Sequence, residues 1–357
     1  MKAKQWLKIF IFAVIIAALT IGASFFLRVP EPRDTVGMYG FYLEEENSLD
    51  VVLIGTSSVY TSFYSPLAYE KQGFTSYPVS TAGMCGSMYP SAVRETLQTQ
   101  DPELFVVDLS GFCFETQTNL DALHRWIDNI RSGPNQKESI RELVPEQEQK
   151  HFQIPFLKYH SNWPNFTYCM KSLQDKNAQK KRGFSVSKNF TVYTGIDDSP
   201  MEEYVFDFSE EGMEALETFL AFLKEEHLEN VLFVRFPYKD LVKDGDNYRK
   251  GIEKIRAEGF DVLDYWGDPG CSSELQLDLA RDYHDLEHLT VFGAEKLTEH
   301  LAAYIDQHYQ LKKEYSTQTK AEWEEATSFV GPLLEKAERA TLETKAEELC
   351  TQKDFLQ

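Results

Sequence analysis

The sequence predicts an α/β domain in which helices cover both faces of a parallel sheet. Short apolar segments rich in β-branched residues alternate with helical segments along most of the chain. Strands that are apolar on both sides are typical of a parallel sheet buried between two helical layers. The chain has 357 residues, of which 42% are hydrophobic, and this suffices for a large core. We therefore expect a three-layer domain that needs no disulfide or metal crosslink.

Five segments have the character of buried strands, and helical segments lie between them and after the last one. The first strand segment, LDVVLI, ends directly before Gly55. The expected strands are residues 49–54, 76–79, 103–109, 230–236 and 260–265. The expected helices are residues 66–72, 89–98, 213–226, 248–258 and 295–308.

The N-terminal segment has the properties of a membrane anchor. Residues 9–27 contain no charge, and nineteen helical residues span roughly the 30 Å of a hydrocarbon core. Lys2, Lys4 and Lys8 precede this run, so the positive-inside rule places the N-terminus in the cytoplasm. We expect a single-pass plasma-membrane protein with an extracytoplasmic body. A signal peptide cleaved near Ala23 is the alternative, but the apolar run exceeds the usual length of about 7–15 residues.

The rest of the chain divides by composition. A polar and aromatic stretch at about residues 132–210 interrupts the alternation and predicts an insertion, and the charged C-terminal tail predicts a pair of helices around residues 331–332. The expected organisation is a cytoplasmic N-terminus (1–8), an anchor (9–28), a stalk (29–48), the α/β domain (49–310) and a helical tail (311–357).

Charge and cysteine usage exclude several classes of ligand. The formal net charge is −21, which repels nucleic acids. The five cysteines are scattered and none forms a CxxC pair, so no zinc site is indicated. We expect neither a cofactor nor a bound metal.

Ser57 is the candidate nucleophile. It follows the first strand in the sequence VVLIGTSSVY, and ligands of open parallel sheets bind beyond the carboxyl ends of the strands. Gly55 allows the backbone to turn sharply there. The alternative is that Thr56, Ser57 and Ser58 only cap the next helix.

Asp285 and His288 are the candidate partners of that serine. A hydroxyl nucleophile needs a base, and the base needs a carboxylate that orients it. Both lie in the sequence DYHDLEHLTVFGA, after the last strand. His284 and Asp282 are competitors for the two roles. The alternatives are a helix cap and a metal site formed by all four side chains.

These motifs together resemble the SGNH (GDSL-type) hydrolases. The similarity comprises the apolar strand before G-x-S, a glycine loop after the second strand and DxxHL before the terminal helix. More narrowly, the chain is similar to the membrane-anchored branch that includes the DltD-like proteins of teichoic-acid D-alanylation and related cell-surface polysaccharide O-acylation proteins. The resemblance covers most of residues 50–310 and implies a flavodoxin-like sheet.

The resemblance also implies roles for individual residues. Ser57 matches the nucleophile, Asp285 the orienting carboxylate and His288 the general base. Gly83 matches the oxyanion-hole glycine, with Gly86 as runner-up, and the backbone N–H of Ser57 would be a second donor.

One motif of the family is missing. Its classical members carry an asparagine donor after the third strand, where this chain reads VDLSG at residues 107–111. The membrane-anchored branch shows the same loss. Either Ser110 or a donor from the insertion would replace that asparagine. Losing one oxyanion donor typically lowers the rate ~10²- to 10³-fold.

The insertion contains IPFLKYHSNWPNF, which resembles a segment of the anchored branch. We expect His160 and Trp163 to contact substrate, because glycan sites use aromatic faces and hydrogen-bonding imidazoles. The alternative is ordinary packing of the insertion onto the sheet.

The expected function is a membrane-anchored serine esterase or O-acyltransferase that acts outside the cell. Its substrates would be acyl esters of cell-envelope polysaccharide or teichoic acid, and its partner a membrane-bound O-acyltransferase. The alternative, from another class, is a non-catalytic accessory protein of such an O-acyltransferase system.

Overall fold

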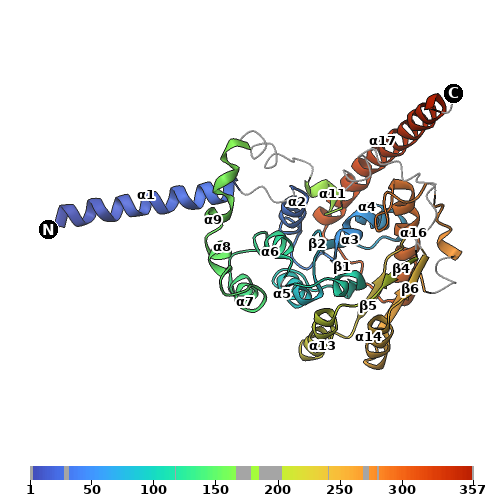
Figure 1. Ribbon diagram of the computed structural model, residues 1–357, viewed down its shortest axis with the longest axis horizontal. Helices are drawn as coiled ribbons and strands as arrows, with labels where there is room; N and C mark the ends of the chain where they lie inside the picture. Colours follow the sequence, from blue (N-terminus) through green and yellow to red (C-terminus); the bar gives the residue numbers. More distant parts are fainter. Residues whose placement is uncertain are drawn as a thin grey trace.

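Figure 1 shows the computed structural model of the chain. A long helix, α1 (Ala3–Leu27), projects from an α/β body that contains the rest of the described residues. The structure describes residues 3–27, 32–116, 118–165, 178–184, 203–239, 241–267, 273–279 and 281–355.

The body is built on a five-stranded parallel sheet with the strand order β2-β1-β3-β5-β7, which is a flavodoxin-like order. The strands are β1 (Val51–Gly55), β2 (Ser76–Ser80), β3 (Leu104–Asp108), β5 (Val231–Arg235) and β7 (Asp261–Asp264). All five lie within the segments that the sequence predicts, to within one residue, so the expected fold class is confirmed.

Successive residues of β1 pack into two separate cores, one on each face of the sheet. Val52 and Ile54 belong to one core, and Val51 and Leu53 belong to the other. This alternation is the normal consequence of strand geometry, and it makes β1 apolar throughout because both faces are covered.

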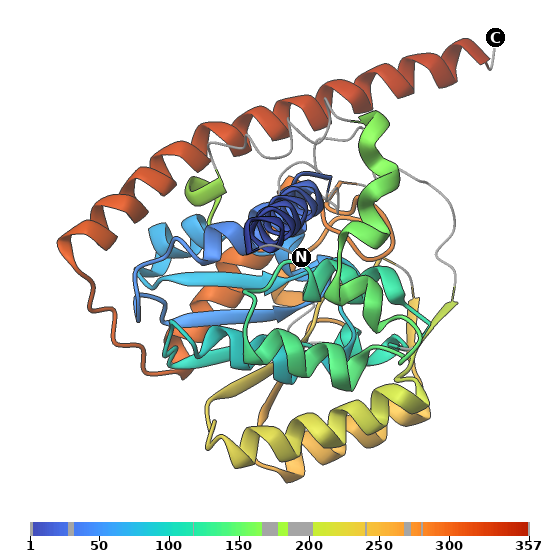
Figure 2. The same cartoon turned by 90° about the vertical axis from the view of Figure 1, so that its left-hand side faces the viewer.

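Helices form the outer layers, and Figure 2 shows the strands between them. The first core includes residues of α2 (Pro32–Phe41), α5 (Tyr89–Thr96), α6 (Leu120–Ile127), α13 (Glu210–Glu225) and α14 (Asp246–Ala257). The second includes residues of α3 (Ser57–Ser62), α4 (Ser65–Gln72), α16 (Val291–His308) and α17 (Thr317–Phe355).

The expected insertion contains short helices and one strand. Its described helices are α7 (Pro134–Leu143), α8 (Gln149–Gln153), α9 (Phe156–Tyr159), the 3₁₀ helix η3 (His160–Asn165) and α11 (Ala178–Lys181). Strand β4 (Glu203–Phe206) pairs in parallel with β6 (Leu241–Asp244) in a second, two-stranded sheet. This second sheet was not predicted from the sequence.

Two terminal segments differ from the expectation. The segment 29–48, expected as a stalk, contains α2, and Met38 and Phe41 are buried in the core, so the globular body begins before residue 49. The C-terminal tail is one continuous helix that passes through Pro332 rather than a pair of helices. A proline removes one backbone N–H from a helix, and burial of Trp323, Val330 and Leu334 stabilises α17 nevertheless.

Gly55→Ala should destabilise the body. The added Cβ would stand 2.3 Å from Cβ of Asp108 and 2.8 Å from Cγ2 of Val59, and overpacking of this kind costs about 1–3 kcal/mol. Gly37→Ala in α2 is the matched control, because no atom lies within 4 Å of its added Cβ.

Thermal unfolding of the full chain in detergent micelles measures both effects. We expect a lower midpoint for G55A and an unchanged or higher midpoint for G37A, since alanine favours helix over glycine by up to about 1 kcal/mol. A wild-type midpoint for G55A would contradict the close packing at the end of β1.

Candidate active site

Ser57 lies on the turn that connects β1 to α3. Thr56 is the N-cap of α3, and its side chain accepts a hydrogen bond from the backbone N–H of Ser58. Ser57 is the first residue of the helix, where backbone N–H groups have no intrahelical acceptor. The Ser57 side chain therefore projects beyond the carboxyl end of β1, as the sequence predicts, and Thr56 rather than Ser57 is the cap.

A buried carboxylate at the end of β3 holds this turn. One oxygen of Asp108 accepts hydrogen bonds from the backbone N–H of Thr56 at 3.1 Å and from its hydroxyl at 2.7 Å. The other oxygen accepts the backbone N–H of Ser110 at 2.9 Å. Burial raises the pKa of Asp108, and these hydrogen bonds oppose the increase. The end of β3 thus sets the position of the nucleophile on β1.

Asp285 and His288 lie on a tight loop before α16. An antiparallel bridge joins Tyr283 to Leu289, and the backbone N–H of His284 donates to the carbonyl of His288 at 2.8 Å. The backbone N–H of Lys239, after β5, donates to the carbonyl of Leu286. The loop is therefore closed on itself and attached to the carboxyl edge of the sheet.

The three predicted side chains meet in one chain of hydrogen bonds. Oγ of Ser57 lies 2.7 Å from Nε2 of His288, and Nδ1 of His288 lies 2.8 Å from each carboxylate oxygen of Asp285. A carboxylate can only accept, so Nδ1 carries the proton and the neutral ring accepts the Ser57 hydroxyl at Nε2. This is the tautomer that a general base requires.

Asp285 is held in its ionised form. Its Oδ1 accepts the backbone N–H groups of Glu287 at 3.0 Å and His288 at 2.8 Å. Burial alone would raise the pKa of Asp285, but the hydrogen bonds and the His288 imidazole outweigh it and lower the pKa to about 2. The carboxylate therefore remains charged at neutral pH and can stabilise an imidazolium ion.

Asp282, which precedes this loop, pairs with basic side chains rather than with His288. Its buried carboxylate bonds to Lys296 at 2.6 Å and Arg281 at 2.9 Å, and its carbonyl accepts the backbone N–H of Thr290. Asp282 is thus paired with Lys296 and Arg281, and Asp285 is paired with His288. These contacts engage two of the four side chains of the alternative metal site formed by Asp282, His284, Asp285 and His288. Within the residues that the structure describes, no group of three or more acidic, histidine or cysteine side chains is arranged to hold a metal ion.

The predicted oxyanion residues have different surroundings. Gly83 follows β2 with a φ of +68°, a conformation that favours glycine, and the backbone N–H of Thr81 joins its loop to the carbonyl of Gly55. Gly86 packs against the ring of Phe112, where an added Cβ would clash at 2.3 Å. Gly83 therefore lies beside the end of β1, whereas Gly86 has a packing role.

Ser110 has its donor groups engaged elsewhere. It is buried, its backbone N–H donates to Asp108, and its hydroxyl lies 3.4 Å from the hydroxyl of Tyr238. In this position Ser110 is better placed to support the turn that carries Ser57 than to contact a substrate.

Asn119, which lies against Gly83, is not among the site residues predicted from the sequence. A Cβ on Gly83 would stand 3.4 Å from Nδ2 of Asn119. Oδ1 of Asn119 caps α6 by accepting the backbone N–H of Ala122 at 3.2 Å, so the NH₂ group is the half of the amide that faces Gly83. Arg125 of the same helix donates to the carbonyl of Ala82. Nothing in the local sequence distinguishes Asn119 from an ordinary cap, since only the fold brings it to Gly83.

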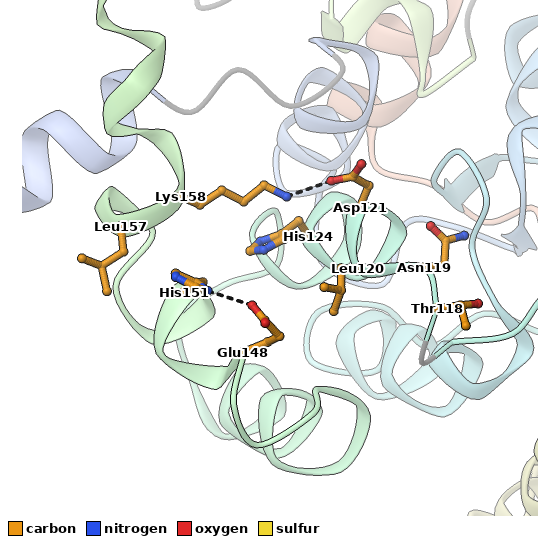
Figure 3. Close-up of a pocket in the computed structure, with 9 residues that line it drawn as sticks. All are labelled: Thr118, Asn119, Leu120, Asp121, His124, Glu148, His151, Leu157 and Lys158. Carbon is orange, nitrogen blue, oxygen red and sulfur yellow. Dashed lines mark hydrogen bonds and ion pairs between the residues drawn. The ribbon is translucent and has the colours of Figure 1, made fainter.

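A cavity of about 420 Å³ extends from Asn119 between α6 and the α8–α9 segment. Figure 3 shows its polar side chains, among them the ion pair of Lys158 with Asp121 and the hydrogen bond between His151 and Glu148. Its volume lies within the range of small-molecule sites. Its lining residues are Thr118, Asn119, Leu120, Asp121, His124, Glu148, His151, Leu157 and Lys158.

His160 and Trp163, the predicted substrate residues, lie next to α1. The His160 ring is exposed and lies within hydrogen-bond distance of carbonyls of its own segment, and the Trp163 side chain is exposed. Neither lines the cavity described above.

Fluorophosphonate labelling of the full chain in detergent tests whether Ser57 is activated. We expect labelling of the wild type and none of Ser57→Ala or His288→Ala, because phosphonylation needs the hydroxyl and the base. Ser58→Ala is the matched control and should be labelled at the wild-type rate, since the Ser58 hydroxyl lies against the carbonyl of Glu287 instead. Unlabelled wild-type protein with a normal unfolding midpoint would contradict an activated serine.

No protein-family model matches the chain, and comparison with curated proteins gives no match either.

Proposed function

We propose that the protein is a membrane-anchored serine esterase or O-acyltransferase of the SGNH type. The observation that carries the proposal is the chain of hydrogen bonds from Ser57 through His288 to Asp285, located beyond the carboxyl ends of parallel strands. Such an arrangement is recognised by geometry and roles rather than by sequence position. The DxxHL and G-x-S motifs and the 2-1-3-5-7 strand order support the same family.

The geometry supports a two-step acyl transfer. Oγ of Ser57 attacks the acyl carbonyl carbon while Nε2 of His288 takes the hydroxyl proton, and the charged Asp285 stabilises the imidazolium. His288 then gives this proton to the departing alcohol oxygen, which leaves an ester on Ser57. Water or a second hydroxyl, deprotonated by His288, attacks that ester and restores Ser57. Hydrolysis and transfer differ only in this second acceptor.

The oxyanion of each tetrahedral intermediate would lie near Gly83. The donors we assign are the backbone N–H groups of Ser57 and Gly83, with Nδ2 of Asn119 in place of the missing family asparagine. Three donors would stabilise the developing charge without reorganisation.

We assign the carbohydrate part of the substrate to the cavity beside Asn119. Side chains such as His151, Lys158 and Asp121 supply donors and carboxylate acceptors for sugar hydroxyls, and the cavity is lined by Asn119, one of the proposed oxyanion donors. The described helix α1, with an apolar span over Lys4–Ser24, supports an anchor that holds this site outside the membrane. A membrane-bound O-acyltransferase remains the proposed partner. The accessory-protein alternative would apply if Ser57 proved unreactive.

Hydrolysis of p-nitrophenyl acetate by the full chain tests the reaction. We expect turnover that Ser57→Ala abolishes and that Asp285→Asn lowers by roughly 10³- to 10⁴-fold in kcat, because the imidazole loses its orienting charge. Methyl β-D-glucopyranoside as a second acceptor should yield an acetylated sugar if transfer occurs, and only acetate if it does not. Equal background rates for wild type and S57A would overturn the proposed function.

Two substitutions at position 119 separate catalysis from helix capping. Asn119→Ser keeps a capping oxygen but removes the N–H donor, whereas Asn119→Ala removes both. If Asn119 is an oxyanion donor, both variants lose ~10²- to 10³-fold in kcat with little change in KM. Only N119A should also lose about 1 kcal/mol of stability in thermal unfolding. Wild-type kcat in N119S would show that Asn119 is only a cap.

A further inference from the structure

Large apolar side chains of the α8–η3 segment are exposed beside the end of α1. Ile154 is 47% exposed, Leu157 is 44% exposed and Trp163 is 70% exposed. Figure 3 shows Leu157 at the outer margin of the cavity, pointing away from α6. Grouped apolar side chains of this size on a protein surface mark a site of contact.

The segment is attached directly to the last turn of α1. Leu27 packs with Tyr159, and Ala23, Phe26 and Phe156 pack against this pair. Nδ2 of Asn162 donates to the carbonyl of Leu27 at 3.1 Å, so the helix end has a polar partner in the body. In Figure 1 the segment from α8 to η3 lies where α1 meets the body.

This attachment sets the height of the segment relative to a membrane. The candidate membrane span of α1 runs to Ser24 and the uncharged run to Leu27, and these two ends are about 5 Å apart along a helix. If α1 crosses a bilayer, residues in contact with Leu27 must lie at the level of the lipid headgroups. Tryptophan and tyrosine are enriched at this level on both sides of a membrane, and Trp163 belongs to the segment.

The charge of the segment fits the same location. The chain carries 57 acidic residues, yet the described residues 149–165 contain no aspartate or glutamate and two lysines, Lys150 and Lys158, the second of which is paired with Asp121. An acidic surface would be repelled by anionic lipids, and this part of the chain avoids that repulsion.

We propose that residues 154–163 form a membrane-interface surface, with Ile154, Leu157 and Trp163 inserted among the lipid headgroups of the bilayer that holds α1. This surface would hold the cavity and Ser57 at a constant height above the membrane. The inference depends on the anchor included in the proposed function, but not on catalysis. It reassigns Trp163 from substrate binding to lipid binding.

Tryptophan quenching in vesicles tests this directly. The full chain is reconstituted into phosphatidylcholine and phosphatidylglycerol vesicles, with or without lipids brominated near the headgroup end of the acyl chain. Trp6 lies on α1 and would itself be quenched, so the reading is made in a Trp6→Phe background. Trp126 and Trp323 are buried in the body.

We expect brominated lipid to remove most of the emission that Trp163 contributes. The quenched component should be present in W6F and absent from W6F/W163F. Trp266 provides the matched control: its indole N–H donates to the carbonyl of Val242, and W6F/W266F should keep the full lipid quenching of W6F. Aqueous iodide should quench Trp163 weakly.

Two results would count against the proposal and are distinguishable. If lipid quenches Trp6 in the wild type but W163F removes no quenched component, α1 is embedded and the surface faces water or a partner protein, so the proposal fails. If the Trp6 component is not quenched, the anchor itself fails. Fluorophosphonate labelling reports separately on the catalytic proposal.

Discussion

The candidate active site depends on the parallel pairing of β1 with a neighbour on each side. This register brings the ends of β1, β2 and β3 to one edge, so that Gly55, Ser80 and Asp108 end their strands together. The Asp108 carboxylate then bonds the turn after Gly55, and the Gly83 loop is hydrogen-bonded to the carbonyl of Gly55. A shift in the pairing would separate the nucleophile from the loops that surround it.

The proposed general base, His288, comes to this edge of the sheet from the C-terminal part of the sequence. Ser57 and His288 are separated by 231 residues, and the loop of His288 is held by α16, by the ion pairs of Asp282 and by the loop after β5. The ion pairs of Asp282 and the backbone hydrogen bond to the loop after β5 are buried or half-buried polar contacts. A buried charge is stable only when it is paired, so these contacts also give the loop a definite position.

A second cluster of polar and aromatic side chains connects three segments of the body that are distant in the sequence. Arg182 follows α11 in the insertion. It bonds to Glu44 at 2.6 Å, and its guanidinium lies 4.8 Å from the ring centroid of Trp323 on α17. All three side chains are buried. The segment after α2, the insertion and the C-terminal helix are therefore packed together.

The sequence by itself determined the strands, the apolar N-terminal helix and the catalytic triad candidates. Apolar β-branched runs form buried strands wherever they pair, and the motifs around Ser57 and His288 are local. It could not place Asn119, the β4–β6 sheet or the Arg182 cluster, because each depends on partners distant in the chain. The segment at His160 and Trp163 illustrates the same limit. The sequence predicts that His160 and Trp163 contact substrate, and the contacts of Asn162 and Tyr159 with Leu27 place their segment at the end of α1. Which surface a side chain faces is decided by tertiary packing, since short segments carry no information about the elements they will meet.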